Sequence, residues 1–158
     1  MSRPHITVPR PSPVVPRGMA REAGDPHEPT VCPDCHALFE HGRWCWGAGV
    51  TAAANRLCPA CRRLREHAPA GVAALSGDFL RTHRDAIMDG VRHLCERAYV
   101  EHPLERLMEI DEDDETISIL TTSAHLARDI GRALKEAWGG ELDLDAAAEG
   151  APRVTWCR

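Results

Sequence analysis

Two identically spaced cysteine pairs constrain the fold of this chain more than any other feature. Cys32 and Cys35 form the first pair, Cys58 and Cys61 the second, and in each pair the residue after the first cysteine is proline. Two such C-x-x-C pairs supply four thiolates at a spacing that suits a tetrahedral metal ion, with metal–sulfur distances of about 2.3 Å. We therefore expect a structural Zn²⁺ site, and the alternative is a redox dithiol or a disulfide pairing.

Cysteine usage and hydropathy bear on the compartment. The chain has seven cysteines, an odd number that forms no even disulfide framework, and this favours a reducing compartment. The first residues lack the apolar segment of a secretory signal, and no run approaches the ~20 apolar residues of a membrane span. We expect a cytoplasmic protein without a membrane partner.

Composition divides the 158 residues into four segments. Residues 1–30 contain seven prolines with scattered arginines, which predicts a disordered arm. Residues 31–67 carry the cysteine pairs and predict a zinc ribbon. Residues 68–77 contain proline and glycine and predict a linker. Residues 78–158 alternate helical and strand-like patterns, which predicts a separate α+β domain.

Periodicity gives the order of elements in this last segment. Apolar residues recur at three- and four-residue spacing over 78–99 and again from the predicted N-cap Ser123 to about Trp138, which indicates two helices. Four strands are predicted at 106–111, 116–121, 142–144 and 154–156. In the first two strands we expect Met108 and Ile110 to face the same way as Ile117 and Ile119. The fold class we expect is α+β: a small zinc ribbon, then an αββαββ domain with a four-stranded, mostly antiparallel sheet and both helices on one face.

Charge is unevenly distributed along the chain. The net charge of −5 is the sum of +1 over 1–31, +2 over 32–67 and −8 over 68–158. Such a chain is no general polyanion binder, so any contact with nucleic acid must come from a local basic patch.

Two basic patches and one aromatic pair are candidates for such a contact. The first basic patch follows the second cysteine pair and consists of Arg62, Arg63 and Arg65. The second lies on the exposed face of the second predicted helix and consists of His125, Arg128, Arg132 and Lys135. Both patches are also explained by ordinary solvated helix faces. Trp44 and Trp46 share one face of an extended segment and can stack on unpaired bases, or instead cover the cysteine cluster as a lid.

The motifs of the common enzyme classes are missing from the sequence. It contains no phosphate-binding Gly-x-x-x-x-Gly-Lys loop, no Gly-x-Ser-x-Gly elbow and no His-x-Glu ahead of a cysteine pair. Four thiolates also complete the coordination sphere of a tetrahedral metal ion, whereas a catalytic zinc keeps one coordination position open. We expect a non-catalytic protein without a small-molecule substrate.

Several stretches resemble a known family. The segment from Pro33 to Cys61, the run Thr-Thr-Ser-Ala-His-Leu-Ala-Arg at 121–128, Gly-Arg-Ala-Leu at 131–134 and Gly-Glu-Leu at 140–142 carry the likeness. Together they resemble a family of short bacterial zinc-ribbon proteins of unassigned function. That family is similar to the N-terminal region of the archaeal and eukaryotic adaptor for export of the large ribosomal subunit, which is named for nonsense-mediated decay. The resemblance covers roughly residues 30–157 and implies binding to RNA or the ribosome.

The function expected from the sequence is therefore that of a zinc-ribbon binding protein acting on RNA or ribosomes. The alternative is a protein–protein adaptor in which the ribbon or the open sheet face binds a partner and the zinc site is purely structural.

Overall fold

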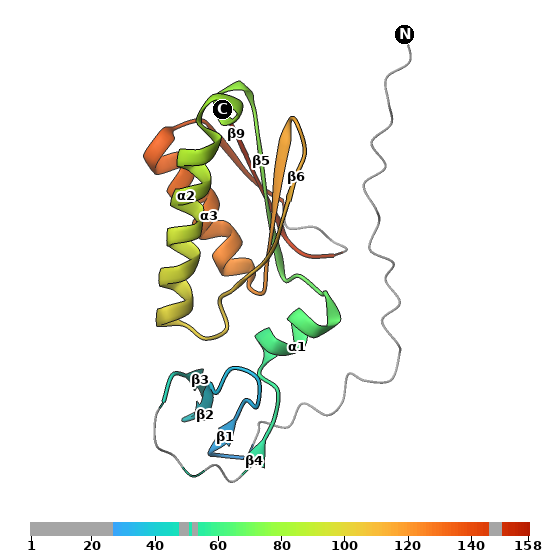
Figure 1. Ribbon diagram of the computed structural model, residues 1–158, viewed down its shortest axis with the longest axis vertical. Helices are drawn as coiled ribbons and strands as arrows, with labels where there is room; N and C mark the ends of the chain where they lie inside the picture. The colour runs from blue at the N-terminus through green and yellow to red at the C-terminus, as the bar shows by residue number, and fades with distance from the viewer. Residues whose placement is uncertain (1–26, 48–50, 52–53, 146–149) are drawn as a thin grey trace.

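The computed structural model describes residues 27–47, 51, 54–145 and 150–158. Two bodies lie one after the other along the long axis, and helix α1 lies at the end of the first body that faces the second (Figure 1). We call them the ribbon (the described part of 30–66) and the sheet domain (the described part of 71–158). Of the predicted arm, residues 1–26 lie outside the described part of the chain.

The ribbon is built from very short strands. They are β1 (Thr30–Val31), β2 (Leu38–Glu40), β3 (Arg43–Cys45) and β4 (Ala54–Asn55), and they lie in the order β3-β2-β1-β4. A two-residue turn joins β2 to β3, and both of its residues, His41 and Gly42, have positive φ. This is the backbone that a tight hairpin requires, because it matches the twist of the strands. Helix α1 (Pro59–Glu66) follows the second cysteine pair.

The sheet domain confirms the α+β class and contains two helices and five strands. In chain order they are β5 (Gly71–Ser76), α2 (Asp78–Glu101), β6 (Leu107–Glu112), β7 (Thr116–Thr121), α3 (Ala124–Trp138), β8 (Glu141–Asp145) and β9 (Arg153–Cys157). The strands lie in the order β6-β7-β5-β9-β8, with β5 parallel to β9 and the other pairs antiparallel. The predicted αββαββ order is present, preceded by one further strand.

That further strand corrects two predictions. Residues 68–77 were predicted to be a linker, yet residues 71–76 form β5, the central strand of the sheet. The sheet consequently has five strands rather than the predicted four, and it is mixed. Gly71, Ala73 and Leu75 alternate as buried residues, so the strand follows the period of two. Its glycine and alanines make it resemble a loop in sequence, because these residues are depleted in strands.

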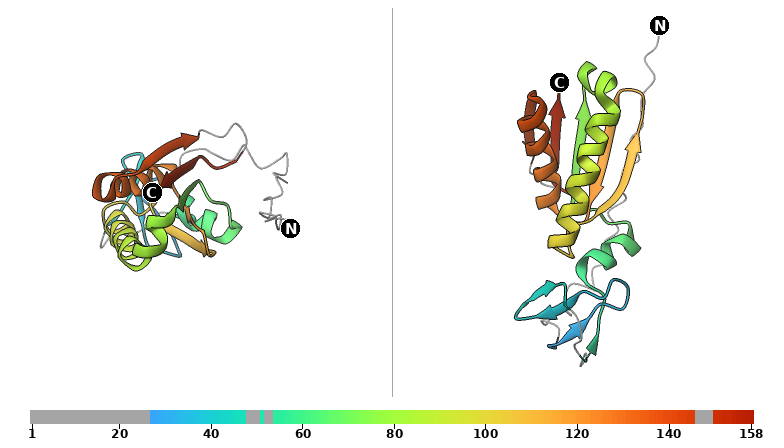
Figure 2. Two further views of the ribbon diagram at one scale, coloured as in Figure 1. Left: turned by 90° about the horizontal axis from the view of Figure 1, so that it is seen from above. Right: turned by 60° about the vertical axis from the view of Figure 1, so that its left-hand side comes forward.

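Both helices cover the same face of the sheet, as predicted, and no helix of the described residues lies on the opposite face (Figures 1 and 2). The core between them is apolar and includes Leu75, Ile87, Ile119, Leu126 and Trp156.

Helix α3 packs very closely on strands β8 and β9. A Cβ atom at Gly131 would lie 2.5 Å from a methyl group of Val154 and 2.7 Å from one of Leu142, so any larger residue there would force these side chains to move. Residue Ser123 caps this helix as predicted, since its hydroxyl accepts hydrogen bonds from the amides of His125 and Leu126.

The β6–β7 hairpin differs from the prediction in one detail. Ile110 pairs with Ile119 and packs against the core, as expected. The register shifts between Leu107 and Glu109, however, so Leu107 takes the place on the core that was predicted for Met108. A bulge of this kind places one extra residue in the strand and turns the following side chains to the other face.

Candidate metal centre

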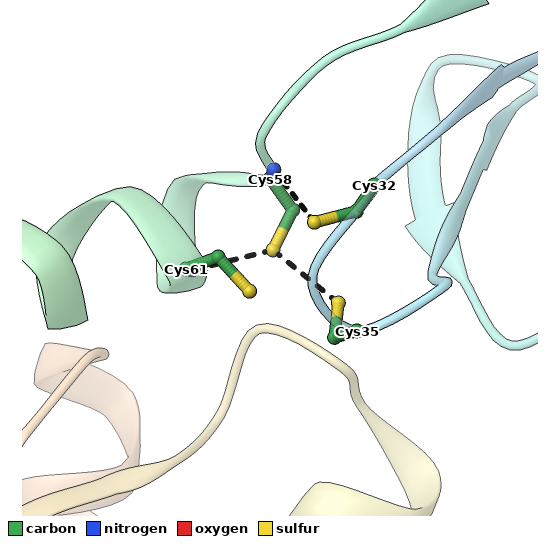
Figure 3. Close-up of side chains that lie close together, drawn as sticks. All are labelled: Cys32, Cys35, Cys58 and Cys61. Carbon is green, nitrogen blue, oxygen red and sulfur yellow. Dashed lines mark hydrogen bonds between the residues drawn. The ribbon is translucent and has the colours of Figure 1, made fainter.

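Cys32, Cys35, Cys58 and Cys61 converge on one point, as the spacing predicted (Figure 3). Their four sulfur atoms all lie within 4.8 Å of one another, and the sulfurs of Cys35 and Cys58 are 3.7 Å apart. Metal–sulfur bonds of about 2.3 Å in a tetrahedron put the sulfurs roughly 3.8 Å apart, so the observed separation fits the edge of such a site. The four cysteines are therefore positioned to bind a metal ion.

The first pair lies in a tight turn between β1 and β2. The amide of His36 donates to the carbonyl oxygen of Cys32 at 2.9 Å, and the amide of Cys32 donates to the carbonyl of Ala37 at 2.8 Å. Residue His36 has a φ of 63°, which completes the turn in the left-handed region. Its ring is exposed, so the turn uses its backbone rather than its side chain.

The second pair lies at the beginning of α1, with Cys58 just before the helix and Cys61 in its first turn. Cys58 is the N-cap, and its sulfur accepts a hydrogen bond from the amide of Cys61 at 3.3 Å. Pro59 occupies the first helical position, where its missing N–H costs nothing. The helix N-terminus thus holds both sulfurs in place, and its dipole favours their negative charge.

Burial and hydrogen bonding act on the sulfurs in opposite directions. For Cys32, burial works to raise the pKa, but amide groups of Cys58, Cys35 and Asp34 donate to the sulfur and lower its pKa to about 7. Burial dominates at Cys58 and raises its pKa to about 11, and it raises the pKa of Cys61 as well. A bound cation reverses this cost of burial, because thiolates at a metal are deprotonated outright.

The donor set determines what the centre can do. Cys32 and Cys58 have no exposed surface and Cys61 is 4% exposed, so three of the four ligands are shielded from solvent. Four sulfur ligands complete a tetrahedron and suit soft or borderline ions such as Zn²⁺ or iron. Four thiolates would leave a bound Zn²⁺ no open position for a water molecule, which is the arrangement typical of structural zinc sites.

Two residues of the sheet domain also lie at the centre, and neither was singled out from the sequence. Leu104 packs against the cysteine cluster, and the guanidinium of Arg106 lies 3.4 Å from the sulfur of Cys61 and 4.0 Å from that of Cys58. Both come from the segment that joins α2 to β6, drawn in yellow beside the cysteines in Figure 3. Only the folded chain brings this segment to the ribbon, since Cys61 and Arg106 are 45 residues apart.

The three arginines after the second cysteine pair have different surroundings. Arg65 forms a two-pronged ion pair with Asp34 of the first turn, at 2.6 and 2.9 Å, and so ties α1 to that turn. The guanidinium of Arg63 donates to the carbonyl oxygen of Ala68 just beyond the end of α1. Arg62 is exposed and makes no ion pair within the described part of the chain. The structure therefore gives two of these arginines internal partners.

The predicted basic face of α3 is exposed but partly neutralised. Asp129 lies 3.6 Å from His125 and 3.8 Å from Arg132. Arg128 and Lys135 are exposed, and neither forms an ion pair with any described residue.

The two tryptophans do not form one exposed platform. Trp44 is half-buried, packs against the cysteine cluster and lies 5.4 Å from the ring of Phe39, which fits a lid over the cysteines. Trp46 is 38% exposed and packs edge-on against Tyr99 of α2, with ring centroids 5.1 Å apart.

The Thr-Thr-Ser run at 121–123 has a structural role in this fold. The hydroxyl of Thr121 donates to the carbonyl of Ser123 at 2.7 Å, and that of Thr122 donates to the carbonyl of Leu104 at 2.7 Å. Thr122 also accepts a hydrogen bond from the amide of Arg106 at 2.9 Å. These bonds fix the segment that reaches the metal centre.

Comparison of the chain with family models, with curated proteins and with solved structures gives no match. Among the helices of the described residues, none has the length and apolar character that crossing a membrane requires.

Proposed function

We propose that this chain is a non-catalytic, cytoplasmic zinc protein that binds RNA, as free RNA or in the ribosome. The observation that carries the proposal concerns the two predicted basic patches in a chain of net charge −5: within them Arg62, Arg128 and Lys135 are exposed and form no ion pair with any described residue. Such side chains are available to phosphate groups, whereas those already paired with carboxylates are not. The family that the sequence resembles points the same way.

The two helices that carry these side chains are held together by β5. The strand begins beside the first turn of α3, since a Cβ atom at Gly71 would lie 2.9 Å from the Cα atom of Ala124. Helix α1 ends only a few residues earlier, at Glu66. Helix α1 and the first turns of α3 thus lie at the same end of the sheet domain (Figure 1), whereas Lys135 lies in the last turn of α3.

The metal centre supports a binding role and no catalytic one. Zn²⁺ is the ion we assign to it, because four thiolates in a closed tetrahedron are the commonest structural zinc ligands. The ion would hold α1, with Arg62, against the first cysteine turn. No small-molecule substrate is part of this proposal.

Salt dependence tests the RNA proposal directly. Fluorescence anisotropy with a labelled single-stranded RNA and co-sedimentation with ribosomes would be measured at several salt concentrations. Three phosphate contacts give a slope of log K against log salt of roughly −2, at about −0.7 per contact on single strands. We expect the triple variant Arg62→Ala/Arg128→Ala/Lys135→Ala to bind at least ten times more weakly and to lose most of this slope.

A control with the same change in net charge separates a specific surface from overall charge. The triple variant Arg43→Ala/Arg81→Ala/Arg153→Ala removes three exposed arginines from β3, the start of α2 and β9. The dissociation constant of this control variant for RNA should lie within about threefold of that of the wild type. Equal losses in both variants, or unchanged binding in the first, would remove the proposed surface.

A protein–protein adaptor is the second candidate, and the uncovered face of the sheet is the observation that favours it (Figure 2). Ala74, Ser118 and Thr155 lie on this face and are half-exposed. If the adaptor is correct, RNA binding should be weak at every salt concentration. Ser118→Arg should then abolish binding of a protein partner purified with the wild-type chain, and the triple variant Arg62→Ala/Arg128→Ala/Lys135→Ala should still bind it.

A further inference from the structure

The residue that most directly joins the ribbon to the sheet domain is Arg106. Its backbone lies just before β6, yet its guanidinium reaches the cysteines of the ribbon, at 3.4 Å from Cys61 and 4.0 Å from Cys58. A guanidinium is permanently charged and carries five donors in a planar fork. It can therefore donate to two neighbouring sulfurs at once.

Contacts within the sheet domain hold the guanidinium of Arg106 in place. Its Nε donates to the carbonyl oxygen of Pro103 at 2.8 Å, and its carbon lies 4.9 Å from the centre of the Tyr99 ring. The backbone amide of Arg106 donates to the hydroxyl of Thr122, and the amide of Thr122 donates back to the Arg106 carbonyl at 2.9 Å. Thr122 is buried, so this support is rigid. The side chain therefore loses little conformational entropy when it binds the thiolates.

Charge explains why a cation belongs at this point. Four thiolates around one divalent ion carry a net charge of roughly −2, which is costly to hold where solvent is excluded. A hydrogen bond from a charged donor to a ligand sulfur spreads this charge and orients the ligand.

Two further contacts join the same surfaces. Leu104 packs against the cysteine cluster, two residues before Arg106. On the other side, the indole N–H of Trp46 donates to the carbonyl oxygen of Tyr99 at 2.9 Å, and the two rings pack edge to face. The end of α2 and the segment after it therefore contact the ribbon at the cysteine cluster and at the residue after β3.

We propose that Arg106 is an outer-sphere partner of the metal centre, and that metal binding thereby locks the ribbon against the sheet domain. The metal then serves two purposes. It stabilises the folded ribbon, and it fixes the orientation of the ribbon relative to the sheet domain. Without the ion, the thiolates that Arg106 contacts are no longer gathered, and the orientation is lost. This inference does not depend on RNA binding, and its test uses none.

Zinc affinity tests the first half of the proposal. Competition with a chromogenic chelator measures the dissociation constant for Zn²⁺ in the full-length wild type, in Arg106→Met and in Arg106→Lys. Loss of an outer-sphere hydrogen bond typically weakens metal binding 10- to 100-fold. We expect a loss in this range for Arg106→Met. Arg106→Lys, which keeps the charge but not the fork, should fall between Arg106→Met and the wild type.

A matched control is Arg84→Met. Arg84 is also half-buried and also bonds a partner on another element, at 2.5 Å from Glu112, but it lies on α2 away from the cysteines. Its variant should bind Zn²⁺ within twofold of the wild type. If Arg106→Met disturbs the fold of the segment after α2, the backbone amide signals of β6 will shift. In that case the zinc affinity of Arg106→Lys, compared with that of the wild type, tests the proposal.

The second half is tested by relative orientation. Residual dipolar couplings of amides in β2, β3 and α1, and in β5, β7 and β9, report whether the two bodies share one alignment frame. We expect one frame in the zinc-loaded wild type and in Arg84→Met, and two frames in zinc-loaded Arg106→Met. Wild-type zinc affinity in both Arg106 variants, or one shared frame in Arg106→Met, would overturn the proposal.

Discussion

The ribbon and the sheet domain reach their folded states with different interiors. At the metal centre of the ribbon, the buried residues of the cluster are three cysteines and two alanines. The strands of the ribbon are two or three residues long. The sheet domain buries fifteen residues in one apolar cluster, with strands of five or six residues. Apolar burial is thus ample in one body and scarce in the other.

The difference predicts where each body obtains its stability. Fully burying one large apolar side chain contributes about 1.5–3 kcal/mol, and the sheet domain has many such side chains. The ribbon has few, so the metal has to supply the stabilisation. Structural zinc sites supply about 10–16 kcal/mol of apparent binding free energy in small zinc domains. The ribbon should therefore respond to changes at the cysteines, and the sheet domain to changes in its apolar core.

The largest expected effect is at Cys58. Its sulfur is both a metal ligand and the cap of α1, so Cys58→Ser should abolish metal binding and unfold the ribbon while the sheet domain stays folded. Amide NMR spectra and metal content measure both outcomes in one sample. We expect collapse of the signals of β1 to β3 and α1, with those of β5, β7 and β9 retained.

The matched control for this variant is Cys157→Ser, which changes an exposed cysteine outside the cluster. It should keep full metal content and the complete spectrum. Simultaneous loss of the ribbon and sheet-domain signals in Cys58→Ser would show that the two bodies fold as one unit, and the comparison would then be wrong.

The second effect is at Trp156, the largest fully buried side chain of the sheet domain. Trp156→Ala leaves a cavity and removes the hydrogen bond from the indole to the carbonyl oxygen of Gly139. We expect a loss of about 3–5 kcal/mol in the free energy of unfolding, measured by urea titration of amide signals in β5 and β7. Metal affinity should remain within twofold of the wild type.

The same substitution at a less buried position is the control. Trp46→Ala removes an indole that is 38% exposed, and it should change sheet-domain stability by less than about 1 kcal/mol. If instead Trp46→Ala costs the sheet domain as much as Trp156→Ala, the two interiors are not independent.

Local signals explain which parts of the structure the sequence could predict. The cap Ser123, the apolar period of α3 and the glycines after Trp138 all act within a few residues, and α3 ends where they indicate. The spacing of the cysteines is likewise a local property, and the four sulfurs do converge. The strand β5 was missed because Ala73 and Ala74 give it weak strand propensity, and its place is set by pairing with β7 and β9.

Long-range contacts explain what could not be predicted at the site. Nothing near Arg106 in sequence marks it as a neighbour of the cysteines, because Thr122 positions it from another strand end. The ion pair that engages Arg65 is equally non-local, since Asp34 lies 31 residues away. A run of arginines looks uniformly available in sequence. The fold gives Arg63 and Arg65 different partners and leaves Arg62 exposed.

The smallest effect is at Asp113, in the turn between β6 and β7 at the end of the sheet far from the ribbon (Figure 1). The hydroxyl of Thr116 and the amides of Glu115 and Thr116 donate to this carboxylate at 2.7–2.8 Å and lower its pKa. Because the folded pKa lies below the unfolded value of about 3.9, the carboxylate stabilises the turn fully above about pH 4. This stabilisation is lost as the pH falls further, through the folded pKa.

The comparison of the two bodies makes this titration informative. The turn belongs to the sheet domain, so the pKa of Asp113 should be the same in zinc-loaded and metal-free protein, even though acid releases the metal from the ribbon. The carboxyl carbon of Asp113 and the amide proton of Thr116, followed by NMR as the pH is lowered, give this pKa. In Asp113→Asn the Thr116 amide should no longer titrate. A pKa at or above the ordinary value would contradict the hydrogen bonding in this turn, and a pKa that shifts on metal removal would mean that the ribbon acts on the sheet domain far beyond their contact at Arg106.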